Sequence, residues 1–338
     1  MEITKRLKII IIALVSVILI FSLLLALEIN GVYTKNTDKS ITVLKGEGFY
    51  NITDKLKEEG IIGNKGIFKV YTRLFYSDKT SNIKPGTYDF NGRMSYGKII
   101  DALGNNPRVA TVTITVPEGY ELREIAALME KNGLCTKEEF YEAANNLKYD
   151  FKYKNQLKNS ENPLEGFLFP DTYVFEKEAT GAELIIKTML KRFEEIYSGL
   201  ESIKTDYSVY EIITLASVIE REAMYEDDFY KVSSVFHNRL KRDDHLSYLQ
   251  SCATVQYILK ERKTVLSIAD TKIDSPYNTY KYPGLPKGPI ASPGALAIKA
   301  ALSPVKSDYL YFLNDKDGKL HFSKTLSEHN AKVNKYVN

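Results

Sequence analysis

The feature that most constrains this chain is an uninterrupted apolar segment near its start. Residues 9–27 contain no charged side chain, whereas Lys5, Arg6 and Lys8 precede them and Glu28 follows. As a helix rising ~1.5 Å per residue, these 19 residues extend about 28 Å, close to the thickness of a bilayer core. The pattern predicts one membrane-spanning helix, and the preceding positive charges predict a cytoplasmic N-terminus with the rest of the chain outside.

A cleaved secretory signal is the alternative interpretation of this segment. Such signals have a shorter apolar core of roughly 7–15 residues and end at a site of small residues. The run here is longer, and no clear A-x-A site follows it. We therefore favour an uncleaved anchor.

The composition excludes several classes of function. The chain has 46 basic and 43 acidic residues and a net charge of +3, which argues against nucleic-acid binding. Its two cysteines, Cys135 and Cys252, cannot supply a disulfide framework or a cysteine zinc cluster. Four histidines without H-E-x-x-H spacing argue against a zinc hydrolase. We therefore expect no metal and no cofactor, and chemistry based on carboxylates, hydroxyls and amides.

A repeated pattern follows the apolar segment. It begins at Val43 and again at Val116, an offset of 73 residues, and each copy continues with a glycine, spaced apolar residues and a second glycine. Each copy predicts a strand, a glycine turn and an amphipathic helix that ends at glycine. The first copy resembles a LysM-type module, a small fold that binds N-acetylglucosamine polymers. A spacer domain without sugar binding is the alternative.

The remaining patterns predict an α+β chain with a mixed α+β C-terminal domain. Pairs with capping-box spacing, Thr136 with Glu139, Thr180 with Glu183 and Ser208 with Glu211, mark three helix starts. Helices are expected over residues 137–146, 181–197, 209–224, 227–241, 292–302 and 326–337. A strand pair is expected over residues 309–313 and 320–322, with its turn at Asp317-Gly318. We expect four parts: an anchor at 1–30, a LysM-like module at 40–105, a second βα unit at 106–155 and the C-terminal domain at 156–338.

The stretch from residue 275 to 294 holds five of the eleven prolines. It can be neither helix nor central strand. A linker is one interpretation, but its tyrosines and Ile290 favour an ordered loop packed on the domain. Ordered loops of this length are usually functional.

One glutamate in the helix expected after Ser208 could act as a general acid. Glu220 borders the apolar face of that helix, and Glu222 lies about 200° round the helix from it. A carboxyl group beside apolar residues loses hydration, so its pKa rises, as a general acid near neutral pH requires. The alternative is an ordinary boundary glutamate paired with Arg239 or Arg242, and helix geometry alone favours that alternative.

Other polar residues stand among aromatic and apolar neighbours. Amides and hydroxyls can bond the polar groups of a sugar, and aromatic rings can cover its C–H faces. Each residue alone is equally well explained as a capping or surface residue. The candidates are Glu165, Asp171, Asn238, Arg239, Gln250, Thr254, Tyr277, Asn278 and Thr279.

Several segments together resemble the endolytic murein transglycosylases (MltG or YceG-like proteins). They are residues 164–175, 215–222 (LASVIERE), 235–240, 249–257 and 277–294, with the ending Y-L-Y-F, H-F and E-H-N. The resemblance covers residues 40–338 and implies catalysis in the C-terminal domain. It assigns the catalytic role to Glu220. Our second candidate for that role is Glu222. The family often has Asp where this chain has Cys252, which puts any role of a carboxylate there in doubt.

The resemblance implies a specific reaction. The family cleaves the β-1,4 bond between N-acetylmuramic acid (MurNAc) and N-acetylglucosamine (GlcNAc) in peptidoglycan without water and leaves a 1,6-anhydro end. It implies a place in the bacterial cytoplasmic membrane, beside glycan-polymerising synthases and division or elongation proteins. A non-catalytic, LysM-like glycan-binding scaffold is the main alternative. A serine hydrolase is a weaker one, because no G-x-S-x-G occurs.

Overall fold

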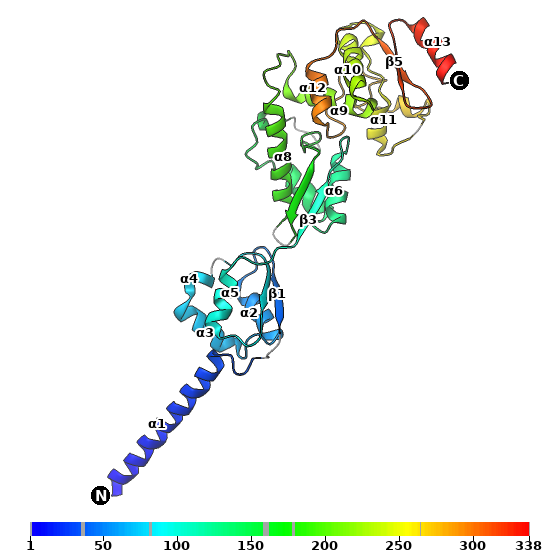
Figure 1. Cartoon of the computed structure of the whole chain (residues 1–338). Helices are drawn as coiled ribbons and strands as arrows, with labels where there is room; N and C mark the ends of the chain where they lie inside the picture. The colour runs from blue at the N-terminus through cyan, green and yellow to red at the C-terminus, as the bar shows by residue number, and fades with distance from the viewer. Residues whose placement is uncertain are drawn as a thin grey trace. The chain divides into compact units, whose positions relative to one another are not determined.

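The computed structural model describes residues 2–34, 38–80, 83–157, 162–177, 180–263 and 265–337. It confirms the predicted α+β class, and Figure 1 shows its elements along the chain. The chain forms two compact units. Unit 1 comprises Met1–Val112 with Phe175–Thr180, and unit 2 comprises Thr113–Val174 with Gly181–Asn338.

Unit 1 begins with the apolar helix α1 (Glu2–Ile29). Its part Arg6–Ile29 is long and apolar enough to cross a membrane, and its apolar side chains are exposed. Near the end of α1, Glu28 is buried and accepts a hydrogen bond from the hydroxyl group of Tyr96. The Glu28 carboxylate also occupies the space where a side chain at Gly63 would lie. These contacts fasten the end of α1 to the rest of unit 1.

The core of unit 1 lies between a two-stranded antiparallel sheet and its helices. The register pairs Lys39 with Phe90 and Val43 with Gly86. Its elements are β1 (Lys39–Val43), α2 (Phe49–Glu58), α3 (Lys65–Phe75), α4 (Ser77–Thr80), β2 (Gly86–Phe90) and α5 (Tyr96–Gly104). Alternate residues of both strands and one face of α2 and α5 are buried together. Asn64 caps α3 by accepting hydrogen bonds from the N–H groups of Gly66 and Ile67.

Both copies of the repeated pattern form the expected elements. β1 and α2 make up the first copy, and β3 (Thr111–Thr115) and α6 (Leu122–Lys131) make up the second. The glycines that follow the strand and the helix adopt positive φ in both copies, as a left-handed turn requires: Gly46, Gly60, Gly119 and Gly133. The second strand pairs with β4 (Thr172–Glu176).

Unit 2 is built around a buried helix, α9 (Val209–Glu222). It packs against α10 (Glu226–Leu240), α11 (Cys252–Leu259) and α12 (Ala295–Leu302), as both views show. Every residue from Ile212 to Ile219 is buried, including Thr214 and Ser217, so α9 is enclosed on all sides rather than along one apolar stripe. Unit 2 also contains α6, α7 (Lys137–Asn146), α8 (Ala182–Ser198) and α13 (Leu326–Tyr336), with short 3-10 helices at Lys154–Gln156, His245–Ser247 and Asp270–Lys272.

The end of the chain forms an antiparallel strand pair, β5 (Tyr311–Asn314) and β6 (Leu320–Ser323), on which α13 packs. Its turn contains Gly318 at positive φ, as the sequence predicts. The predicted caps at Thr136 and Ser208 are confirmed as full capping boxes. The cap predicted at Thr180 is wrong, because Gly181 is the N-cap of α8 and no side chain caps it.

Candidate active site

Glu220 lies in the last turn of α9, at the edge of the buried part of unit 2. Its Oε2 accepts a hydrogen bond of 2.9 Å from the backbone N–H of Gly294, where the proline-rich loop passes into α12. The pKa of Glu220 is raised to about 7, chiefly by burial and also by the negative charge of Glu118, while the bond from Gly294 and the charge of Arg221 act in the opposite direction. The carboxyl group can therefore hold or release a proton near neutral pH.

The ion pair that the sequence offered as an alternative for Glu220 does not form. Arg239 instead donates to the backbone carbonyls of Leu310, Tyr248 and Leu249. Arg242 pairs with Asp244. Glu220 is thus a partly buried carboxyl group held by a backbone amide rather than by either arginine.

Glu222 faces a different set of partners, in agreement with its predicted place round the helix. Its carboxylate accepts a hydrogen bond from the hydroxyl group of Ser251, and burial raises its pKa. Glu222 borders a cavity of about 370 Å³ whose lining includes Arg239, Gln250, Cys252 and Tyr280. The cavity therefore gathers three of the predicted site residues: Glu222, Arg239 and Gln250.

The lining of this cavity combines rings with polar groups. Residues of β5, including Tyr311, and His329 of α13 complete it. The guanidinium group of Arg239 lies 5.3 Å from the centre of the Tyr311 ring, within cation–π range. Gln250 is exposed and has φ of 51°, a left-handed conformation that is uncommon outside glycine. This lining has the aromatic faces and hydrogen-bonding groups that suit a sugar.

Three other predicted residues are buried and bonded to the protein itself. Thr254 and Thr279 share a hydrogen bond of 2.9 Å, and the backbone carbonyl of Thr279 accepts one from the N–H of Gln250. Asn278 donates to the carbonyls of Thr271 and Ile273. Their exposed fractions are 0–1%, so they hold the loop and the start of α11 in place rather than face solvent.

The remaining predicted residues also have partners within the protein. Glu165 is buried and accepts hydrogen bonds from the Leu122 N–H and the Tyr257 hydroxyl group. Asp171 forms an ion pair of 2.7 Å with Arg192. Asn238 donates to the carbonyls of Ser307 and Tyr309, and the ring of Tyr277 lies 5.0 Å from that of Tyr257. These contacts do not involve Glu220.

Sequence reasoning missed two residues that border Glu220, namely Glu118 and Gly294. Glu118 belongs to the V-P-E-G turn, which the sequence marked only as part of a repeat. Gly294 ends the loop that the sequence singled out as functional. The described part of that loop contains no named helix or strand, and it is packed on α9 through a bond from the Ile290 N–H to the Ser217 hydroxyl group.

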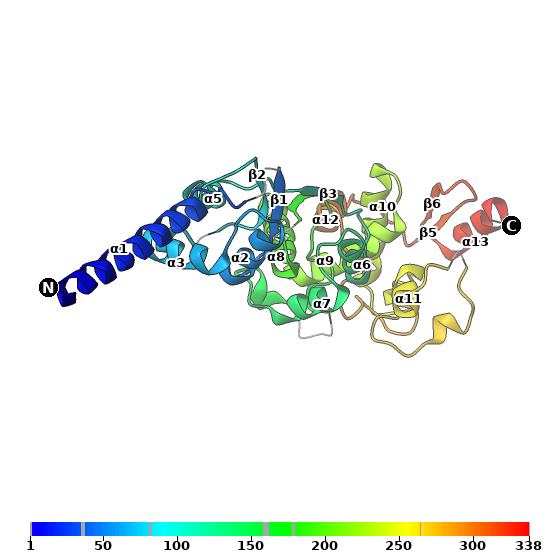
Figure 2. The same cartoon turned by 90° about the horizontal axis from the view of Figure 1, so that it is seen from below.

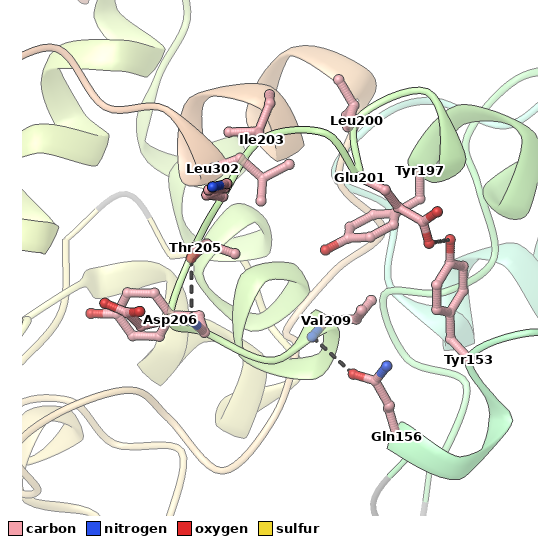
Figure 3. Close-up of a pocket in the computed structure, with 12 residues that line it drawn as sticks. Tyr153, Gln156, Tyr197, Leu200, Glu201, Ile203, Thr205, Asp206, Val209 and Leu302 are labelled. Atoms are coloured by element: carbon pink, nitrogen blue, oxygen red, sulfur yellow. Dashed lines mark hydrogen bonds between the residues drawn. The ribbon is translucent and has the colours of Figure 1, made fainter.

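A larger cavity, of about 720 Å³, lies elsewhere in unit 2 (Figure 3). It is bordered by the end of α8, by residues 200–207 and by Tyr153 and Gln156. Tyr153 donates a hydrogen bond to Glu201 across its edge, and the N–H of Val209 donates to Gln156. None of the predicted site residues lines it, so size alone does not identify the candidate site.

The described residues contain no group of three or more His, Cys, Asp or Glu side chains placed to hold a metal ion. The chemistry that the arrangement around Glu220 offers is proton transfer by a carboxyl group with a raised pKa.

Comparison with known proteins shows to which family the chain is related. The sequence model of the YceG-like family matches residues 41–335. A relative from Bacillus subtilis (strain 168), named endolytic murein transglycosylase, is 38% identical over 89% of this chain and 85% of its own length. A protein of the same name from Streptococcus pneumoniae (strain D39) is 32% identical over 90% of this chain, which spans 59% of that relative. A crystal structure of a yceG-like protein from Listeria monocytogenes has a TM-score of 0.60 and 34% identity, covering 88% of this chain and 100% of that one. The chain therefore belongs to the YceG-like family.

Proposed function

We propose that this protein is a lytic transglycosylase that cleaves the β-1,4 bond between MurNAc and GlcNAc in nascent peptidoglycan. The general activity follows from its relatives, which are named endolytic murein transglycosylases. The single observation that supports the chemistry is the partly buried Glu220, whose pKa is raised to about 7. Because cleavage of nascent strands limits their length, the reaction would terminate glycan elongation.

One carboxyl group can serve this reaction. A hydrolytic glycosidase uses two, an acid and a nucleophile or base. Here the C6 hydroxyl group of MurNAc is the nucleophile. Protonated Glu220 gives its proton to the glycosidic oxygen, and the bond from MurNAc C1 to that oxygen breaks with its electron pair on the GlcNAc side. The C6 oxygen then bonds to C1 and its proton passes to Glu220, which closes the anhydro ring and restores the acid without water.

The cavity of about 370 Å³ that Glu222, Arg239 and Gln250 border does not include Glu220, so we place there a part of the glycan strand away from the bond that is cleaved. Its rings, including Tyr280 and Tyr311, would cover sugar faces, and its amide and guanidinium groups would bond sugar oxygens. Asn278, Thr279 and Thr254 support this wall from inside. Glu165, Asp171, Asn238 and Tyr277 would act by positioning the segments around the site.

The other parts of the chain would bring this site to its substrate. We propose that α1 anchors the protein in the bacterial cytoplasmic membrane, with Lys5, Arg6 and Lys8 on the cytoplasmic side. Helices enclosed between two paired strands, in the order β1–α2–α3–α4–β2, support the proposal that unit 1 is a LysM-like glycan-binding module, with a spacer as the alternative. Glycan-polymerising synthases and division or elongation proteins are the proposed partners.

The test is product analysis with full-length protein and uncrosslinked glycan in ¹⁸O-labelled water. Lytic cleavage gives anhydro ends without the label, whereas hydrolysis gives reducing ends that carry it. Glu220→Gln should lower the rate by about 10²-fold or more, because Gln cannot transfer the proton. Glu222→Gln separates the two candidate acids, and only the Glu220 variant should lose the bond-breaking step. A glycan-binding scaffold would bind the glycan, form no product and be unaffected by Glu220→Gln.

The pH dependence gives a second test. With a pKa of about 7, Glu220 holds its proton in about nine-tenths of molecules at pH 6 and in about a tenth at pH 8. The rate of the acid step should therefore fall about tenfold between these values. A glutamate with the ordinary pKa of 4.5 would lose about a hundredfold over the same range.

A further inference from the structure

A second carboxylate lies beside Glu220 and comes from a distant part of the chain. The turn after β3 carries Glu118, which is exposed. A Cβ atom at Gly294 would lie 2.9 Å from Glu118 Cγ and closer still to its carboxylate, so the Glu118 side chain fills the space beside that glycine. The N–H of the same Gly294 donates to Glu220 at 2.9 Å. One backbone position thus touches both carboxylates.

The turn is fixed against the end of the proline-rich loop. The N–H of Gly119 donates to the carbonyl of Ser292 at 2.8 Å, and the N–H of Ser292 donates to the carbonyl of Tyr120 at 2.7 Å. Gly119 has φ of +75°, and a Cβ atom there would lie 3.6 Å from Glu220 Cγ. The backbone of the turn therefore packs directly on the Glu220 side chain, and the placement of Glu118 is set by paired hydrogen bonds.

Two charged groups act on Glu220 among the described residues. Glu118, from the turn, disfavours the ionised form, and Arg221, from α9 itself, favours it. Arg221 is engaged elsewhere, because it lies 3.7 Å from Glu121 and donates to Gln256 at 3.2 Å. The positive charge next to Glu220 is thus partly offset by Glu121, whereas the exposed carboxylate of Glu118 forms no ion pair within the described residues.

We propose that Glu118 is a positioning residue of the cleavage reaction, which holds the proton on Glu220 before cleavage and makes Glu220 a stronger base afterwards. The inference rests on the proposed transglycosylase function. After Glu220 has given its proton to the glycosidic oxygen, two like charges face each other across Gly294. That repulsion is relieved when Glu220 takes the proton of the MurNAc C6 hydroxyl group. The same proximity of Glu118 to Glu220 therefore favours both steps, the retention of the proton before cleavage and its recovery from the C6 hydroxyl group afterwards.

The test compares the pH profiles of Glu118→Gln, of Glu118→Asp and of Glu138→Gln, a control exposed on α7. In Glu118→Gln, the decline of the rate at high pH should move to lower pH by about 0.5 unit or more. With a shift of about 0.5 unit the rate should then fall about threefold at pH 8 but only about 1.2-fold at pH 6. Glu118→Asp keeps the charge and should recover most of the shift, and the control should match the wild type.

A readout without turnover separates this inference from the function on which it rests. The carboxyl groups can be titrated by ¹³C NMR in the unliganded protein, with Glu220→Gln identifying the Glu220 signal. Titration of Glu220 at lower pH in Glu118→Gln supports the inference even if no lytic product forms, whereas absence of product in the wild type overturns only the proposed function. An unmoved Glu220 titration, or an activity loss equal at every pH, overturns the inference and leaves Glu118 a purely structural part of the turn.

Discussion

Replacing Glu165 with glutamine tests whether a buried carboxyl group carries a proton in the folded protein at neutral pH. Glu165 is 3% exposed, and its two oxygens accept hydrogen bonds of 2.8 Å from the Leu122 N–H and 3.1 Å from the Tyr257 hydroxyl group. Burial raises its pKa to about 8, from an ordinary 4.5. The folded-state pKa is thus the higher one, so the contribution of this group to stability is fully present below about pH 4.5 and is lost as the pH rises through 8.

The size of this loss follows from the shift. One pKa unit corresponds to ~1.4 kcal/mol, so a rise from 4.5 to about 8 permits a loss of up to about 5 kcal/mol in the free energy of unfolding. Glutamine keeps an acceptor for Leu122 and cannot ionise. We expect Glu165→Gln to match the wild type within about 1 kcal/mol at pH 5 and to exceed it by roughly 2–5 kcal/mol at pH 8.

Pulse proteolysis across a urea series, with fragments of unit 2 identified by mass spectrometry, measures this difference at each pH. Glu142→Gln, exposed on α7, is the matched control and should show no pH-dependent gain. A difference between Glu165→Gln and the wild type that stays constant from pH 5 to pH 8 would refute the reasoning, because Glu165 would then be ionised in the folded protein.

Three further substitutions or labels probe the site. Gly294→Ala should displace Glu118, whose Cγ would lie 2.9 Å from the new Cβ, and so lower kcat/KM by about tenfold or more. The free energy of unfolding should change by under about 1 kcal/mol, because the φ of −76° at this position suits alanine. Unchanged kinetics would contradict the packing of Glu118 against Gly294. Glycan bound to the Glu220→Gln variant should slow the alkylation of the exposed Cys252, which lines the cavity. Cys135 is the internal reference, since burial raises the pKa of its thiol to about 11. Equal labelling of Cys252 with and without glycan would show that glycan does not occupy the cavity. Asn278→Ala should destabilise unit 2 by about 2 kcal/mol or more, because two carbonyls lose their donor; a raised KM with unchanged stability would instead show a direct sugar contact.

Local signals in the sequence were enough to place the helix that carries Glu220. The capping box of Ser208 and Glu211 predicted where α9 starts, and the spacing of its apolar residues predicted that it is a helix with a buried face. Asn64 before α3 is a comparable signal, because its side chain caps that helix. Thr180 shows the limit of such rules, since the adjacent Gly181 takes the N-cap position and Thr180 donates its N–H to Glu176 instead.

The contacts around Glu220 could not be predicted in the same way. Glu118 and Gly294 are far from Glu220 along the chain, and they meet because two loops exchange backbone hydrogen bonds at Ser292. The residue type of Asn278 or Thr279 is compatible with a sugar or with a backbone carbonyl as partner. Only the burial of both side chains shows that their partners lie within the protein.

The hydrogen bond between Glu28 and Tyr96 bears on how far the protein can move relative to its membrane helix. Burial raises the pKa of Tyr96, so its hydroxyl group stays a donor to the Glu28 carboxylate. If α1 lies in the bilayer, these contacts attach unit 1 directly to the end of its membrane helix. Any latitude must come from the connections between the units, which the chain crosses three times, after Val112, Val174 and Thr180. The reach of unit 2 from the membrane would then depend on these three crossings and not on the junction of α1 with unit 1.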